Sequence, residues 1–279
     1  MTTPYRQVLV HLDASASAGA RLAAARSLAQ EHGAALAALY ATVPVYLELP
    51  YPPEGAPGLA SSLMDVEDER RRAARRTFDE AMRTPGPTAT WAETREMPAA
   101  GAFVAQALHA DLLVLGQHDP AGAANGVPPD FAESVVLASG KPALVLPYTG
   151  AARRPGGTAA IAWKETREAA RAVSAAMPLL QRAGRVHVLA WEEEPALEVR
   201  GQQLDLDGYL RLHGIVPTWH RGGRLAEPLG EILLSQLSDL DADLLVMGCY
   251  GHSRAREWIL GGTSRTVLRS MTLPVLMAH

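Results

Sequence analysis

Short apolar runs alternate along the chain with longer segments in which apolar residues recur every three or four positions. The runs have the length of buried strands, and the recurring segments predict helices that pack one face on a sheet. In the first half, strands are predicted at 8–12, 35–41, 88–91, 112–115 and 143–146, with helices at 20–32, 63–82, 99–108 and 131–138. The stretch 43–58, rich in Pro, Tyr and Gly, predicts a loop.

The first predicted helix has an apolar face opposite a charged one. On this interpretation Ala20, Ala24, Ala25 and Leu28 face the sheet, whereas Arg21, Arg26 and Glu31 face solvent. In the next helix the run EDERRRAARR interleaves acidic and basic residues, which favours helical ion pairs on a solvated face over a nucleic-acid surface.

The second half repeats the same alternation of runs and helical segments. Strands are predicted at 159–163, 186–190, 216–219, 244–247 and 275–277, and helices at 169–180, near 209, at 229–240 and at 263–270. Pro178 is expected to kink the helix that contains it or to end it early.

Two stretches show that the halves are copies of one unit. ADLLVLGQH at 110–118 reappears as ADLLVMGCY at 242–250, and the segment between the copies, YTGAARRPGG, has the composition of an exposed linker. We therefore predict two domains, residues 1–149 and residues 150–279. Strands that alternate with helices predict parallel sheets covered on both faces, with ligands bound beyond the carboxyl ends of the strands.

A glycine-rich stretch follows the strand at 244–247 in the second copy. Gly248 ends that strand, Gly251 follows after two residues, and Gly261 and Gly262 stand directly before Thr263 and Ser264. Backbone N–H groups at glycine turns and at a helix start suit a bound phosphate. The alternative is purely structural: a strand end, a turn, and Thr263 or Ser264 as the helix cap.

The spacing Gly-x2-Gly-x9-Gly, with GHSRARE and GGTSRTVL around it, resembles the nucleotide loop of the universal stress protein family, in its tandem two-domain form. The resemblance implies five-stranded sheets of order 3-2-1-4-5 and a fold like that of the adenine-nucleotide alpha hydrolases. In this family the third glycine is followed by Ser or Thr, but here Gly262 stands in that position and Thr263 comes one place later.

The resemblance also implies that an aspartate at the end of the first strand holds the adenosine part of the nucleotide. Domain one keeps this residue as Asp13, but it lacks the loop and carries Asp119 where a phosphate would lie. Domain two keeps the loop and carries Lys164 at the aspartate position. The nucleotide-binding residues implied for domain two are Gly248, Gly251, His252, Ser253, Arg254, Gly261, Gly262, Thr263, Ser264 and Lys164.

Composition narrows the classes of function. The chain has 279 residues, 48% of them hydrophobic and 20% charged, and a net charge of −4, which argues against a nucleic-acid binder. Cys249 is the only cysteine, so neither an intrachain disulfide nor a cysteine zinc site is expected. The start of the chain lacks a leader pattern and no run is long enough to cross a membrane, so we expect a cytoplasmic protein.

An enzyme is not expected. Gly251-His252-Ser253-Arg254-Ala255 approaches a hydrolase elbow, but Ser253 lies too far beyond its strand. Histidines at metal-ligand spacing are not found. Two functions remain open: a stress-response protein that binds ATP, with Mg, in domain two with little or no turnover, or a nucleotide-independent interaction module. In both, the domains are expected to pair as a pseudo-dimer through apolar edge strands, with a protein partner or a homodimer beyond that.

Overall fold

A computed structural model describes residues 4–48, 57–122, 125–149, 157–191, 204–223, 229–249 and 262–279. The chain divides into two compact units, Pro4–Ala152 and Arg153–His279, which we call domain one and domain two. Because residues 150–156 lie outside the described ranges, the domain boundary between residues 149 and 150 stays a prediction.

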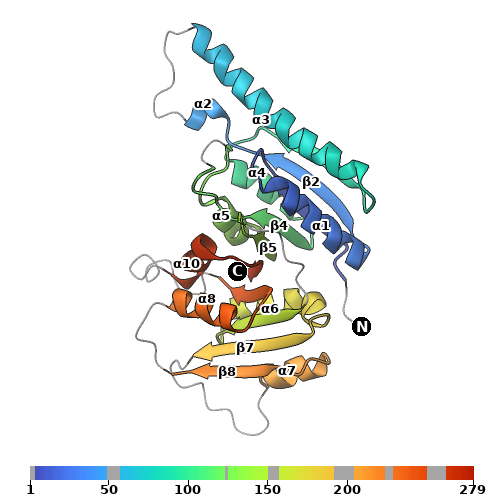
Figure 1. Ribbon diagram of the computed structural model, residues 1–279, viewed down its shortest axis with the longest axis vertical. Coiled ribbons are helices and arrows are strands. Elements are labelled where there is room, and N and C mark those ends of the chain that lie inside the picture. Colours follow the sequence, from blue (N-terminus) through green and yellow to red (C-terminus); the bar gives the residue numbers. More distant parts are fainter. Residues whose placement is uncertain are drawn as a thin grey trace. The chain divides into compact units, whose positions relative to one another are not determined.

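Domain one is a parallel sheet with helices on both faces (Figure 1). Its strand order is β3-β2-β1-β4-β5, and every neighbouring pair in it is parallel. Helix α1 packs on α3, and α4 packs on α5. The elements are β1 (Gln7–Leu12), α1 (Ala18–His32), β2 (Ala35–Ala41), α2 (Val45–Glu48), α3 (Pro57–Arg83), β3 (Ala89–Thr94), α4 (Ala99–Ala107), β4 (Leu112–Gly116), α5 (Phe131–Ser139) and β5 (Ala143–Leu146).

Domain two repeats this arrangement. Its order, β8-β7-β6-β9-β10, is again 3-2-1-4-5 when the strands are counted within the domain, and all its pairs are parallel. The predicted fold class is confirmed in both domains. The elements are β6 (Thr158–Trp163), α6 (Arg167–Leu180), β7 (Arg185–Trp191), α7 (Leu206–Leu212), β8 (Thr218–Gly222), α8 (Leu229–Asp239), β9 (Leu244–Gly248), α10 (Thr263–Ser270) and β10 (Val275–Ala278).

Two local predictions were wrong, and a third was wrong in one of its alternatives. The stretch 43–58 is not all loop, because α2 lies within it and α3 begins at Pro57, where the fixed φ of proline suits a first helical residue. Pro178 does not end α6 early, since the helix continues to Leu180, and the expected kink stays a prediction. The third strand of domain two begins at Thr218, two residues later than predicted.

The predicted orientation of the first helix was only partly right: Ala25 and Leu28 are buried and Glu31 is exposed as predicted, but other positions differ. Arg21 and Arg26 are buried, with 3% and 9% of their surface exposed, whereas Ala20 is exposed. The residues that α1 buries follow a different stripe: Ala18, Arg21, Leu22, Ala25, Arg26, Leu28, Ala29 and His32. An alanine-rich helix has little hydrophobic contrast between its faces, so the packing partners set its rotation.

Arg26 joins α1 to the turn between α3 and β3. Its Nη1 donates to the carbonyl of Ala81 at 2.7 Å and to the hydroxyl of Thr84 at 2.6 Å, and its Nη2 donates to the carbonyl of Thr84 at 2.9 Å. Nε donates to the carbonyl of Pro87 at 3.0 Å. The guanidinium thus satisfies three backbone carbonyls of one turn. At Gly86 in that turn, a side chain would lie 2.9 Å from Arg26 Nη2, at a φ of +138° that favours glycine.

Replacing Arg26 should therefore destabilise domain one. We expect Arg26→Ala to lower the free energy of unfolding by about 2–4 kcal/mol, because three partly buried carbonyls lose their donor and the buried part of the arginine side chain is removed. Arg26→Lys should restore only part of this, since an ammonium cannot reach all four acceptors at once. Urea unfolding followed by circular dichroism measures both changes. Arg72→Ala, which removes an exposed arginine of α3, is the control, and equal stability of all variants would contradict this role.

Candidate functional site

In each domain the carboxyl ends of the first and fourth strands lie side by side, as the strand order requires. β1 pairs with β4, so Asp13, directly after β1, lies near Gly116, the last residue of β4. β6 pairs with β9, which places Lys164 near Gly248 in the same way. In open parallel sheets this is the edge where ligands bind, so the two edges are the candidate sites.

In domain one a buried ion pair fills this edge. Arg21 reaches from α1 and donates from Nη2 to Asp13 Oδ2 at 2.8 Å, and from Nε to the carbonyl of His11 at 2.7 Å. The other oxygen of Asp13 accepts from the N–H of Ser15 at 2.8 Å. A side chain at Gly116 would overlap Nη1 of Arg21. The carboxylate that the family resemblance assigns to adenosine is thus held by a cation of the same domain.

Burial and charge set the protonation of this cluster. Burial by itself raises the pKa of the Asp13 carboxyl, but the Arg21 guanidinium beside it holds that pKa below its ordinary value. Burial lowers the pKa of His11 from 6.5 to about 4. The His11 ring packs against Phe131 and Phe103, and its Nε2 donates to the carbonyl of Ala41 at 2.8 Å. At neutral pH the cluster holds a neutral histidine and a charge-balanced pair.

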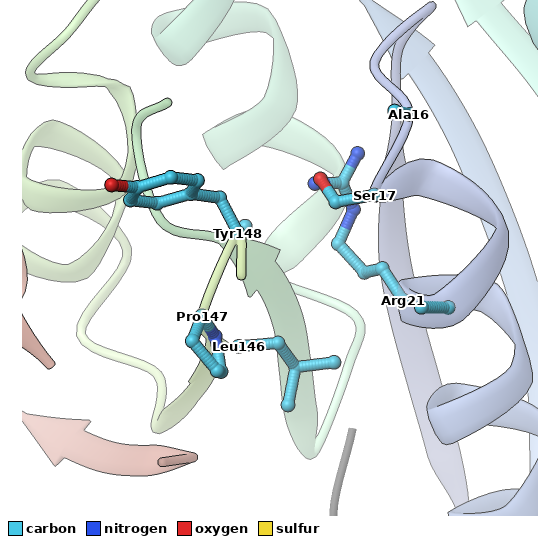
Figure 2. Close-up of a pocket in the computed structure, with 8 residues that line it drawn as sticks. Ala16, Ser17, Arg21, Leu146, Pro147 and Tyr148 are labelled. Carbon is cyan, nitrogen blue, oxygen red and sulfur yellow. The ribbon is translucent and has the colours of Figure 1, made fainter. Parts of the chain in front are cut away.

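Two cavities border the ion pair, and both are small. One has a volume of about 150 Å³ and is shown in Figure 2, and the other, under the loop that carries His118 and Asp119, has about 30 Å³. Pockets for drug-sized ligands and cofactors have roughly 300–1,000 Å³. Neither cavity of domain one has room for a whole nucleotide.

In domain two the edge is built differently. Lys164 follows β6, and two residues later the Thr166 hydroxyl caps α6 by accepting from the N–H of Ala169 at 3.3 Å. Gly248 ends β9 directly against this helix start, because a side chain there would lie 2.6 Å from the carbonyl carbon of Glu168. Gly248 is therefore required by packing, whatever else it does.

The predicted glycine loop is described only at its two ends. Gly251, His252, Ser253, Arg254 and Gly261 lie outside the described residues.

Gly262, Thr263 and Ser264 begin α10 at the carboxyl end of the sheet. The residue that caps this helix is Gly262, so the predicted cap at Thr263 or Ser264 was wrong. The carbonyl of Gly262 accepts from the N–H of Arg265 at 2.9 Å, which leaves the Thr263 hydroxyl outside the capping role. Ser264 is buried and Thr263 is partly exposed.

Cys249 directly follows Gly248, and it behaves as a packing residue. It is 1% exposed, its backbone N–H donates to the carbonyl of Ala278 at 3.0 Å, and its thiol donates to the same oxygen at 3.3 Å.

In the part of the chain that the structure describes, no group of three or more His, Cys, Asp or Glu side chains could hold a metal ion. Nor is any described helix both long and apolar enough to span a membrane.

The sequence reasoning missed Arg21 and His11 as residues of the edge in domain one. A signal for Arg21 was present: it lies eight residues after Asp13, in the first turn of α1, so its side chain can reach back to the strand end. His11 gave a weaker signal, as the one titratable residue within an otherwise apolar strand.

His11 should make domain one sensitive to mild acid. Its pKa is lower in the folded state (about 4) than in the unfolded state (6.5), so its contribution is complete above pH 6.5 and is lost as the pH falls through 4. This loss amounts to about 3 kcal/mol. His11→Gln should remove it. Because His187 in domain two also has a lowered pKa, the measured quantity is the difference between wild type and variant in urea unfolding at several pH values. Parallel pH profiles would contradict the assignment.

Solved structures of other proteins have the same fold as this chain. A universal stress protein from Archaeoglobus fulgidus has a TM-score of 0.66 at 15% identity, over 98% of this chain and 95% of that one. A Pseudomonas aeruginosa protein described as functionally unknown has a TM-score of 0.58 at 16% identity, over 99% and 93% of the two chains. These likenesses concern the fold alone.

Sequence comparison gives the family. A curated universal stress protein from Synechocystis is 44% identical to this chain over 46 residues, which span only 16% of each protein. The model of the universal stress protein family matches residues 4–147, in domain one, and residues 188–279, in domain two. These two matches cover more than half of the sequence, so the chain belongs to the universal stress protein family, with two tandem domains, which implies a role in the stress response.

Proposed function

We propose that domain two binds ATP, with Mg²⁺, as a regulatory ligand in the stress response and without substantial turnover. The observation that carries this proposal is the position of Lys164: it follows β6 at the edge where β9 ends in Gly248, and the N-terminus of α10 lies at the carboxyl end of the same sheet. An ammonium group and a helix N-terminus both favour a phosphate.

The two domains differ in the charge that they place at this edge. In domain one, Asp13 after the first strand is neutralised by Arg21, eight residues further on. In domain two Lys164 follows the first strand, and the atoms nearest to a side chain at Gly248 would be backbone atoms of Glu168 and Ala169, at the start of α6. The cation has thus moved from the helix to the strand end, which supports anion binding in domain two rather than in domain one.

The phosphates would then lie between Lys164, Gly248 and the start of α10 at Gly262, Thr263 and Ser264. Gly251, His252, Ser253, Arg254 and Gly261, in the part of the loop outside the described residues, complete the proposed nucleotide site.

The proposal that ATP is not turned over rests on the hydrogen bonds of three histidine rings in domain two. Nδ1 of His279 lies 3.0 Å from the carbonyl of Cys249, so that ring is held by the backbone. Nδ1 of His187 lies 2.9 Å from Nε2 of His220, far along β7 from the strand end. His187 and His220 are thus paired with each other rather than placed as a general base at the proposed site.

A second candidate function is a nucleotide-independent interaction module. Each five-stranded order has two outermost strands, and one of them is wholly apolar: β5, with the sequence ALVL, in domain one and β10, with VLMA, in domain two. Apolar edge strands invite pairing with another strand, which supports the intrachain pseudo-dimer and, beyond it, a homodimer or a protein partner. A cytoplasmic location is part of both proposals.

The chain offers a selective test of ATP binding, because Lys141 and Lys164 are its only two lysines. Amine acetylation of the full chain, read by mass spectrometry, should be slowed at Lys164 by Mg-ATP and unchanged at Lys141 in domain one. Calorimetric titration should show one site per chain, abolished by Gly251→Val. If millimolar Mg-ATP gives no heat of binding and does not slow acetylation of Lys164, the ATP proposal is wrong and the interaction module remains.

The substitution Lys164→Asp tests how the nucleotide is held. If the ammonium contacts phosphate, we expect ATP to bind about 10- to 100-fold more weakly, the range for a lost charged hydrogen bond. Lys141→Ala, which removes the other lysine, should leave the affinity unchanged. Tighter binding by Lys164→Asp would show instead that an aspartate at this place holds adenosine and that Lys164 does not hold the phosphates.

A further inference from the structure

The larger cavity of domain one opens between the start of α1 and the segment that follows β5 (Figure 2). Most of its wall is apolar: Ala16 and Ala20 come from the α1 side, and Leu146, Pro147 and Tyr148 from the β5 side. Figure 2 shows the Tyr148 hydroxyl pointing away from Arg21, so this residue presents its ring to the cavity rather than its oxygen. The loop that follows β4 does not line this cavity, which separates it from the place where the family resemblance puts phosphates.

The polar end of the cavity is the guanidinium of Arg21. Nε and Nη2 of this side chain are used, by the His11 carbonyl and by Asp13. For Nη1 the described residues provide no hydrogen-bond partner, and it lies beside Gly116, where any side chain would overlap it. Arg21 is 3% exposed, so two N–H donors of a buried, fixed cation remain for a ligand.

Ser17 supplies a second donor at the same end. It is the N-cap residue of α1, yet its hydroxyl does not cap the helix and lies 3.1 Å from the hydroxyl of Ser15. In domain two the corresponding helix is capped by Thr166. Ser17 and Arg21 both line the cavity, and the positive end of the α1 dipole lies at the start of the same helix.

The charges around the cavity select the kind of anion. Asp13 already neutralises Arg21 on one side, and the His11 ring, with a pKa lowered by burial, adds no positive charge at neutral pH. Because Asp13 already balances the charge of the guanidinium, a ligand with one negative charge suits this site better than a ligand with two. The planar fork of arginine matches a carboxylate and a phosphate alike, so the charge balance, and not the shape of the donor, selects between these anions. The cavity therefore favours a carboxylate monoanion over a phosphate dianion.

We propose that this cavity binds a small organic carboxylate, with its charged group on Arg21 and Ser17 and an apolar body against Leu146, Pro147 and Tyr148. A cavity of about 150 Å³ holds a body the size of a benzene ring. This site is independent of the ATP site proposed for domain two, since all of its residues belong to domain one.

Benzoate is the probe, and the measurement is saturation-transfer NMR on the full chain, with a titration for affinity. We expect binding in the millimolar range or tighter, and binding of the neutral analogue benzamide to be about 10- to 100-fold weaker, as for a lost hydrogen bond to a charged group. Inorganic phosphate should not displace benzoate. Displacement by phosphate at equal concentration would overturn the carboxylate assignment.

Two variants locate the site without touching the ion pair. Ala20→Leu places a larger side chain on the cavity wall and should abolish benzoate binding, whereas Ala23→Leu, at an exposed position of α1 outside the cavity, should leave it intact. Ser17→Ala should weaken it several-fold. Circular dichroism checks that each variant is folded.

Benzoate binding that survives Ala20→Leu would overturn the location, and no benzoate signal in the wild-type chain would overturn the proposal. ATP titration of the same samples reports on domain two separately, because Ala20→Leu should leave ATP binding unchanged.

Discussion

Arg21 is the residue around which domain one arranges the ends of its strands. A buried cation costs several kcal/mol in desolvation unless a carboxylate and further hydrogen bonds compensate it, and Asp13 and the His11 carbonyl provide both. The guanidinium in turn requires Gly116 at the end of β4, since any side chain there would overlap it. Its charge also favours the neutral form of His11 next to it. The helix, both strand ends and the protonation of the histidine therefore depend on one another.

The strands and their order could be predicted because each buried strand is a short run of apolar residues that needs no partner to be identified. β4 reads LLVLG and β9 reads LLVMG, and their repetition gives the tandem organisation as well. The rotation of α1 could not be predicted in this way. Its sequence, AGARLAAARSLAQEH, contains so many alanines that several stripes look apolar, and hydropathy places every arginine outside. Only the position of Asp13 and of the carbonyls around Arg26, which are tertiary contacts, makes the inward rotation favourable.

The candidate site of domain two was predictable to the same extent. Lys164 and Gly248 follow strands directly, so the parallel pairing of β6 with β9 places them together without any knowledge of side chains. The reason for Gly248 was not predictable, since a glycine loop and a close helix approach leave the same residue in the sequence. In the structure the close approach of the helix requires this glycine, because any side chain at this position would contact the backbone of Glu168. A glycine motif in the sequence therefore does not show that each of its glycines takes part in ligand binding.

The two domains differ in where they place a cation at this edge, and the two ligand chemistries that we propose follow from that difference. An arginine that comes from the helix and is neutralised at the strand end closes that edge to a nucleotide, but it leaves Nη1 open toward the α1 side of the sheet. In domain two a lysine directly follows the strand end, at the edge where the proposal puts the phosphates. If both proposals hold, domain one responds to a small carboxylate and domain two to a nucleotide. The tandem chain would then combine two signals that a single domain of this fold cannot hold together, because the same strand end would have to present opposite charges.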